Sequence, residues 1–225
     1  KVKAFPGFES LSLRHYIKET SHLRLVFLFL AHLPHIPQEG TMALKATIFK
    51  ARLQVADMDR HYYGDHSLTL ARHPSETDER MMLRLLTFAR HAHEDLAFGR
   101  GVSTDDEPDL WIRSLTGEIE LWIQLGQPDE REIRRACGRA RQVVLYTYSG
   151  QGAGIWWEQL GSRLAVLGNL SVYDIPPESM QALAQLAARG MDLNVTIQDG
   201  AIWLANAETA VEINIAARQQ TGTPQ

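Results

Sequence analysis

The sequence predicts a mixed α+β fold in a single domain, and three observations lead to this prediction. The chain has 225 residues, of which 44% are hydrophobic and 22% charged, a balance typical of a globular domain with a sizeable core. Alternating patterns that indicate strands occur before and after the helical segments. Between residues 76 and 148 the predicted order is helix–strand–strand–strand–helix–strand, with β-hairpins flanking this block. Together these features favour an α/β roll.

The first elements are predicted to be a hairpin and a helix. Residues 46–56 alternate between hydrophobic and polar side chains, and residues 66–72 form the partner strand after a turn-rich segment. Ser75 is the predicted N-cap of the following helix, with Asp78 completing an approximate capping box, and the hydrophobic spacing continues to Glu94.

The remaining elements alternate along the chain. Three strands are predicted at residues 96–102, 110–115 and 119–125. A second helix begins after Pro128, because Asp129 and Glu130 lie at the positive end of its dipole. Further predicted elements are a strand at 142–148, a helix at 155–160, a strand at 169–175, a helix at 177–189, a hairpin at 192–198 and 201–204, and an edge strand at 211–215.

Composition also limits where the protein acts and how the chain is divided. The single cysteine, Cys137, excludes a disulfide framework and favours a reduced, cytoplasmic protein without disulfide partners. The hydrophobic run 25–31 is too short to cross a membrane, which needs about 20 residues. We interpret residues 1–41 as a leader outside the domain, either translated upstream of a natural start at Met42 or disordered. Docking of this leader on the domain and a targeting role are the alternatives. The domain is expected at 42–218 and a frayed tail at 219–225.

Six segments carry a resemblance to a known family. They read MALKATIFKA (42–51), LTLARHPSETDERMMLRLL (68–86), DDEPDLWIR (105–113), LWIQLGQPDEREIRRAC (121–137), NLSVY (169–173) and IQDGAIWL (197–204). From Met42 to about Ile215 the chain resembles the bacterial YaeQ family. The resemblance implies a variant of the PD-(D/E)xK fold, a restriction-endonuclease-like α/β roll with an α-β-β-β-α-β core. It also implies a loose association with transcription, and hence a protein partner there.

A nuclease of this type holds Mg²⁺ between carboxylates, and the ion activates the attacking water. Asp109 follows Pro108 and matches the first acid of the motif. The second acid falls on Gln124 and the lysine on Gly126, so the motif is degenerate. Glu120 lies on the same strand face as Gln124 by its spacing, and it could supply a displaced carboxylate.

The predicted catalytic residues are therefore Asp109, Glu120, Gln124 and Glu79. Asp109 and Glu120 are the predicted ligands of Mg²⁺. The acid that the superfamily often carries on its first helix would be Glu76 or Glu79, although an acid in a first helical turn also stabilises the helix dipole. For Glu120 the alternative interpretation is a solvated surface position.

A row of arginines is the strongest basic feature of the sequence. Spacing of four residues places Arg131, Arg135 and Arg139 along one side of the second helix, with Arg134 beside them. Such a row can contact phosphates of a nucleic acid, or it can be a solvated helix face that aids solubility. The net charge of −4 argues against tight nonspecific DNA binding.

Three functions are compatible with these patterns. One is a metal-dependent, nuclease-like enzyme that acts on nucleic acid. The alternative is a catalytically inactive protein that binds nucleic acid or a transcription-related partner. The third is a structural or interaction protein that has lost both cleavage and nucleic-acid binding.

Overall fold

Residues 46–100 and 107–221 are described in a computed structural model, and they form a mixed α+β fold of two sheets and four helices. The predicted leader, residues 1–41, lies outside the described residues. The predicted order of elements between residues 76 and 148 is confirmed, because a helix, three strands, a helix and a strand follow one another there. In the described part of the chain, no helix is both long and hydrophobic enough to cross a membrane.

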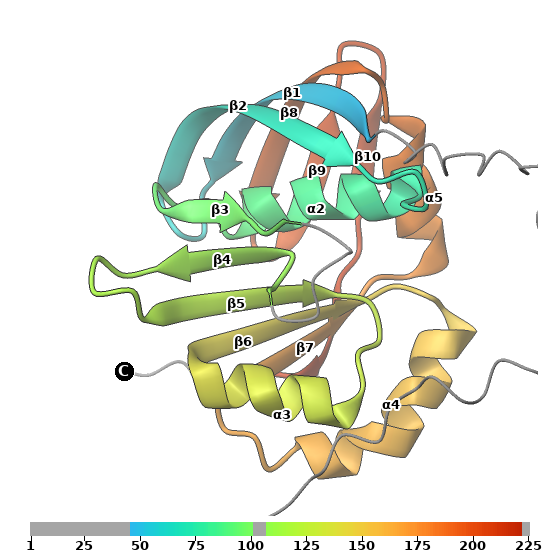
Figure 1. The fold of residues 1–225 in the computed structure, drawn as a ribbon. Coiled ribbons are helices and arrows are strands. Elements are labelled where there is room, and N and C mark those ends of the chain that lie inside the picture. The colour runs from blue at the N-terminus through green and yellow to red at the C-terminus, as the bar shows by residue number, and fades with distance from the viewer. Residues whose placement is uncertain (1–45, 101–106, 222–225) are drawn as a thin grey trace, which may run out of the picture. The chain divides into compact units, whose positions relative to one another are not determined.

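Sheet A joins the two ends of the described chain (Figure 1). Its strand order is β10-β9-β8-β1-β2, and β1 and β8 are parallel although they lie more than 130 residues apart. The strands are β1 (Thr47–Asp57), β2 (Tyr62–Arg72), β8 (Gly190–Gln198), β9 (Ala201–Ala205) and β10 (Ala210–Ile213). The predicted N-terminal and C-terminal hairpins are therefore one continuous sheet.

Sheet B contains the parallel strands of the fold. Its order is β11-β7-β6-β5-β4-β3, and β5, β6 and β7 are parallel. The strands are β3 (Leu96–Phe98), β4 (Leu110–Arg113), β5 (Ile119–Leu125), β6 (Ala140–Thr147), β7 (Leu170–Asp174) and β11 (Ala216–Gln219). Two crossover helices, α3 (Glu130–Arg139) and α4 (Gln151–Leu164), connect the parallel strands and lie on the same side of the sheet (Figure 1).

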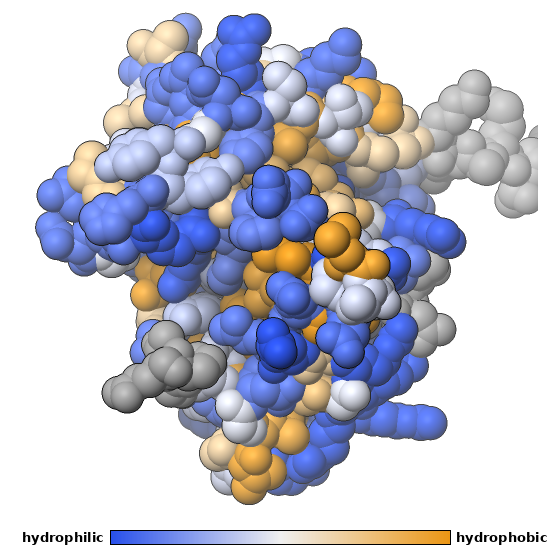
Figure 2. Space-filling model, turned by 90° about the vertical axis from the view of Figure 1, so that its left-hand side faces the viewer, coloured by the Kyte–Doolittle hydropathy of each residue, from blue (hydrophilic) through white to orange (hydrophobic). Residues whose placement is uncertain are grey.

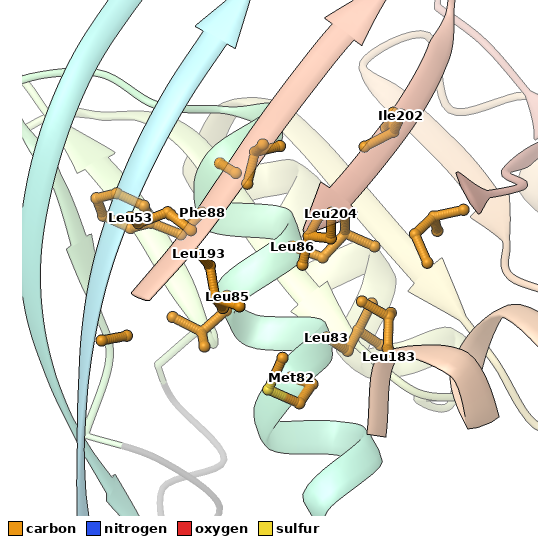
Figure 3. Packing of buried hydrophobic residues seen from close by; sticks show 14 of the residues in the cluster. Leu53, Met82, Leu83, Leu85, Leu86, Phe88, Leu183, Leu193, Ile202 and Leu204 are labelled. Atoms are coloured by element: carbon orange, nitrogen blue, oxygen red, sulfur yellow. The ribbon is translucent and has the colours of Figure 1, made fainter. Parts of the chain in front are cut away.

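The helices α2 (Asp78–Arg90) and α5 (Pro177–Gln185) lie between the two sheets (Figure 1). Almost every residue of α2 from Met81 to Ala89 is buried, because sheet A covers one side of the helix and sheet B the other. Figure 3 shows Leu85 and Phe88 of α2 pointing toward Leu53 and Leu193 of sheet A. A second, smaller core forms where α3 and α4 cover the other face of sheet B.

The start of α2 differs from its prediction. The N-cap is Thr77, whose hydroxyl accepts a hydrogen bond from the Arg80 backbone amide at 3.2 Å. Ser75 instead lies in the exposed turn before the helix, where its hydroxyl contacts the His73 ring. The reason is local geometry: Thr77 has extended backbone angles directly before the first helical residue, which places its hydroxyl three residues before the Arg80 amide that it satisfies.

This difference gives a prediction. We expect Thr77→Ala to lower the free energy of unfolding by about 1 kcal/mol, because an orphan helix amide loses its acceptor. Ser75→Ala should change it by less than about 0.5 kcal/mol, as is usual for exposed positions. Urea unfolding followed by circular dichroism measures both values, and a larger loss for Ser75→Ala than for Thr77→Ala would contradict the assignment.

Several other elements differ from their predicted bounds; α2 ends at Arg90 rather than Glu94, α5 ends at Gln185 rather than residue 189, and β2 begins at Tyr62 rather than residue 66. Helix α4 begins at Gln151, four residues before the predicted start, and it includes Gly152 and Gly154. The predicted tail from residue 219 is also partly wrong, because Gln219 ends strand β11. Its side-chain amide donates hydrogen bonds to three backbone carbonyls, of Leu164, Leu167 and Leu170. Pairing of β11 with β7 is a long-range contact that no local pattern indicates.

Candidate functional site

A buried cluster of two acids and two arginines lies where α2 begins and β4 starts. Glu76 is 6% exposed, and its carboxylate accepts hydrogen bonds from Arg84 at 3.0 and 3.2 Å. Arg80 donates one bond to Glu76 at 3.2 Å and another to Asp109 at 2.5 Å. Helical spacing explains three of the four members, since Glu76, Arg80 and Arg84 follow one another at intervals of four residues. Tertiary structure supplies Asp109.

Asp109 is fixed at the start of β4 by two different donors. One carboxylate oxygen contacts Arg80, and the other accepts a hydrogen bond from the backbone amide of Leu125 at 2.8 Å. Burial raises the pKa of Asp109, while the charge of Arg80 acts in the opposite direction. Burial also raises the pKa of the neighbouring Tyr148 hydroxyl. Burial by itself would lower the pKa of Arg80. The nearby Asp109, Tyr148 and Glu76 have the larger effect together, so the pKa of Arg80 is raised.

The structure does not bring the two predicted metal ligands together. Glu120 is exposed on β5, whereas Asp109 contacts the amide of Leu125, five residues further along that strand. At about 3.3 Å per residue, this separation is roughly 16 Å. Asp109 and Glu120 therefore lie near opposite ends of β5.

Gln124 also lies apart from Asp109. Its side chain accepts a hydrogen bond from the Trp122 indole at 3.3 Å, and Trp122 belongs to the core beneath α3. Alternation along β5 thus directs Gln124 toward the α3 face, while the Asp109 carboxylate reaches Arg80 on α2. Glu79 is half-buried in the first turn of α2 and Gly126 follows β5.

We tested whether the residues at Asp109 fit Mg²⁺. This ion needs several oxygen ligands, usually including one or two carboxylates. Both Asp109 oxygens already accept hydrogen bonds, and Glu76, the nearest other acid, is shared by Arg80 and Arg84. Within the described ranges, no three His, Cys, Asp or Glu side chains are grouped so that they could hold a metal ion. This arrangement does not fit a magnesium site.

Sequence reasoning missed the two arginines of the cluster. Their signal was the spacing Glu76-x₃-Arg80-x₃-Arg84, which predicts an ion-paired helix face. The partner of Arg80 was not predictable from local spacing, because Asp109 is 29 residues away in the sequence.

The predicted arginine row is present on the exposed side of α3. Arg131, Arg135 and Arg139 are all exposed. Arg139 also lies over the Trp122 ring, with 5.4 Å between its guanidinium carbon and the ring centroid. Arg134 has a different role, because it pairs with Glu130 at 2.8 Å, and Glu130 also pairs with Arg163 of α4 at 2.7 Å. Arg134 therefore helps to join α3 to α4.

Comparisons with known proteins agree with one another. The family model described as YaeQ protein matches residues 42–215. The YaeQ protein of Escherichia coli (strain K12) is 51% identical over 179 residues, which cover 80% of this chain and 99% of the relative. The YaeQ protein of Salmonella typhi is 52% identical over the same length and coverage.

Two crystal structures have a similar fold. The YaeQ protein from Xanthomonas axonopodis pv. citri is 49% identical with a TM-score of 0.75, covering 77% of this chain and 98% of that chain. The YaeQ protein from Pseudomonas syringae is 32% identical with a TM-score of 0.74, covering 78% and 97%. Because these matches cover most of this chain and nearly all of each relative, the chain belongs to the YaeQ family.

Proposed function

We propose that this protein binds nucleic acid through the exposed face of α3 and does not cleave it. The row of Arg131, Arg135 and Arg139 carries the proposal. Successive members are four residues apart, which corresponds to about 6 Å along the helix axis. Such a row can contact consecutive phosphates, and arginine suits this role because its planar guanidinium binds phosphate in a bidentate manner.

The local charge supports this surface. Residues 126–142 contain five arginines and three acidic residues, whereas the whole chain has a net charge of −4. One of the acids, Glu130, is engaged by Arg134 and Arg163, and another, Glu132, completes the capping box of α3 with Asp129. The acids thus hold the helix in place, and the row of three arginines faces solvent. A local positive surface of this kind attracts phosphates despite the acidic net charge.

The cluster at Asp109 supports binding without cleavage. The order α2-β3-β4-β5-α3-β6 is the order expected of a PD-(D/E)xK core, which associates the fold with nucleic acid. In place of a second metal-binding acid, Asp109 contacts the Arg80 guanidinium, and that cation is permanently charged. Arg80 therefore places a positive charge against Asp109, which repels a metal cation at this carboxylate.

Charge reversal on α3 tests the proposal. We expect Arg131→Glu/Arg135→Glu to weaken binding of a fluorescein-labelled oligonucleotide by more than tenfold, measured by fluorescence anisotropy. The dependence of log Kd on log salt should become flatter by about 1.5, since roughly two phosphate contacts are lost. The matched control is Lys50→Glu/Arg52→Glu, two exposed cations on β1 of sheet A. Equal weakening by both double variants, or no binding by the unmodified protein, would overturn the proposal.

The absence of cleavage has its own test. The unmodified protein and Asp109→Asn are incubated with labelled DNA and RNA in Mg²⁺ or Mn²⁺, and the products are separated on a denaturing gel. We expect both proteins to leave the strands intact. Cleavage that Asp109→Asn abolishes would overturn the non-catalytic assignment and favour a metal-dependent nuclease.

A further inference from the structure

A pocket of about 660 Å³ lies at the other end of sheet B, where the parallel strands begin. Residues from β4, β5, β6 and β7 line it together with His93, which follows α2. This volume falls in the range of pockets that hold small organic ligands. Glu120 lines this pocket, whereas Asp109 and its cluster do not, so the pocket is separate from that cluster.

The floor of the pocket is a flat row across sheet B. Ile112 pairs with Leu121, and Leu121 pairs with Gln142 on the next strand. Neighbouring strands lie about 4.8 Å apart, so the row spans roughly 10 Å from Ile112 to Gln142. Figure 2 looks at the left-hand side of Figure 1, and hydrophobic surface gathers in the middle of this face with hydrophilic side chains around it. Ile112 and Leu121 give the pocket a small hydrophobic floor among mostly polar lining residues, which suits a planar ring that carries polar edges.

One wall of the pocket is held rigidly. Tyr173 lines the pocket, the Arg90 guanidinium lies 4.2 Å from its ring centroid, and the Tyr146 ring is stacked on it at 5.4 Å. Nη1 of Arg90 is buried and has no hydrogen-bond partner among the described residues. Both contacts restrain the Tyr173 ring at the wall of the pocket.

Two amides give the pocket hydrogen-bonding groups of the type that recognises nucleobases. Gln142 is exposed at the border of the floor. The Asn169 amide nitrogen donates to the backbone carbonyls of Cys137 and Ala140 at 2.9 and 3.0 Å, which fixes the side chain and leaves its oxygen as an acceptor. Gln142 can present a donor and an acceptor side by side to a base edge, whereas Asn169 offers only its acceptor oxygen.

The pocket is continuous in sequence with the arginine row. Arg139 is the last residue of α3, and Arg141, which lines the pocket, follows two residues later. A strand whose phosphates follow the α3 row would therefore reach the pocket at its Arg141 side. A nucleotide there must leave the base stack to enter, which a single strand permits at lower cost than a duplex.

We propose that this pocket takes one unstacked nucleotide of a single-stranded nucleic acid, with its base on the Ile112–Leu121 floor and its phosphate near Arg141. The inference rests on the proposed function and specifies its substrate class. Gln142 and Asn169 recognise the base edge, and the α3 row binds the adjoining phosphates.

Nucleoside 5′-monophosphates serve as probes of the pocket alone. Titration calorimetry with AMP, GMP, CMP and UMP is expected to show millimolar or tighter binding of at least one of them. Gln142→Ala and Arg141→Glu should each weaken it by about tenfold, the scale of a base or phosphate contact. The matched controls, Gln54→Ala and Arg52→Glu, lie on exposed positions of β1 and should leave the affinity unchanged. No binding of any of the four, or equal weakening by the controls, overturns the pocket assignment.

Oligonucleotide binding separates this inference from the proposed function. We expect a labelled single strand to bind more tightly than a duplex of the same sequence, and Gln142→Ala to reduce that preference. Arg131→Glu/Arg135→Glu should weaken the single strand while leaving monophosphate binding unchanged. If the oligonucleotide binds but the monophosphates do not, the pocket assignment fails and the proposed function stands. If the monophosphates bind but no oligonucleotide does, the proposed function fails and so does the single-strand assignment.

Discussion

Replacing Glu76 with alanine is expected to lower the free energy of unfolding by about 3–5 kcal/mol, because the change leaves buried cations without their counter-ion. The Glu76 side chain is 2% exposed and that of Arg84 7%. Among the described residues, Glu76 is the ion-pair partner of Arg84, while Arg80 retains Asp109. Arg84 is therefore the buried cation whose electrostatic stabilisation falls most when Glu76 is removed.

Urea unfolding measures this loss, and Glu79→Ala is the matched control. Glu79 lies in the first turn of α2 but is only half-buried, so its removal should cost less than about 1 kcal/mol. A double variant, Glu76→Leu/Arg84→Met, should lose less than Glu76→Ala alone, since it replaces the buried pair with hydrophobic side chains. If Glu76→Ala costs no more than Glu79→Ala, the buried ion pair does not stabilise the fold as described.

Acidification is expected to destabilise the protein through His91. Burial, reinforced by the charges of Arg90 and Arg60, lowers the pKa of His91 from 6.5 to about 3. Nε2 of its ring lies 2.7 Å from the Tyr146 hydroxyl. Between pH 6.5 and 3 the unfolded chain binds a proton at this histidine and the folded protein does not. The stabilisation is complete above pH 6.5 and is lost as the pH falls, by at most about 1.4 kcal/mol per pH unit.

The contribution of His91 is isolated by comparison with His91→Gln. Urea unfolding of both proteins at several pH values between 4.5 and 7.5 gives two curves of stability against pH. Below pH 6.5 the curve of the unmodified protein should fall more steeply, and the difference in slope is the contribution of His91. Parallel curves would show that His91 takes up its proton equally well in the folded protein.

Local sequence patterns were sufficient to predict most of the helices and strands, and also the arginine row on α3. Strand β5 was predicted with the bounds that the structure shows, because its hydrophobic alternation lies between clear turn signals. The row on α3 was equally accessible, since side chains four residues apart lie on one side of any helix. Gly152 and Gly154, in contrast, concealed the start of α4, because glycine disfavours helices unless tertiary packing compensates.

The candidate site required information that no local pattern holds. Asp109 and Glu120 were expected to share a metal ion, but the register of β4 on β5 places Asp109 beside the amide of Leu125. The motif comparison also gave no sign of Arg80 as the partner of Asp109, because that contact depends on how α2 lies across sheet B.

By itself, the sequence determined the mixed α+β class, the order of the central elements and the cation-rich face of α3, because all three follow from periodicities within a few turns or strands. Only the tertiary structure decided that β1 pairs with β8, that β11 joins sheet B, and that Arg80 meets Asp109. These contacts join segments from 29 to more than 130 residues apart. Their partners are selected by burial of shared hydrophobic faces and pairing of buried charges, which exist only once the layers have packed together.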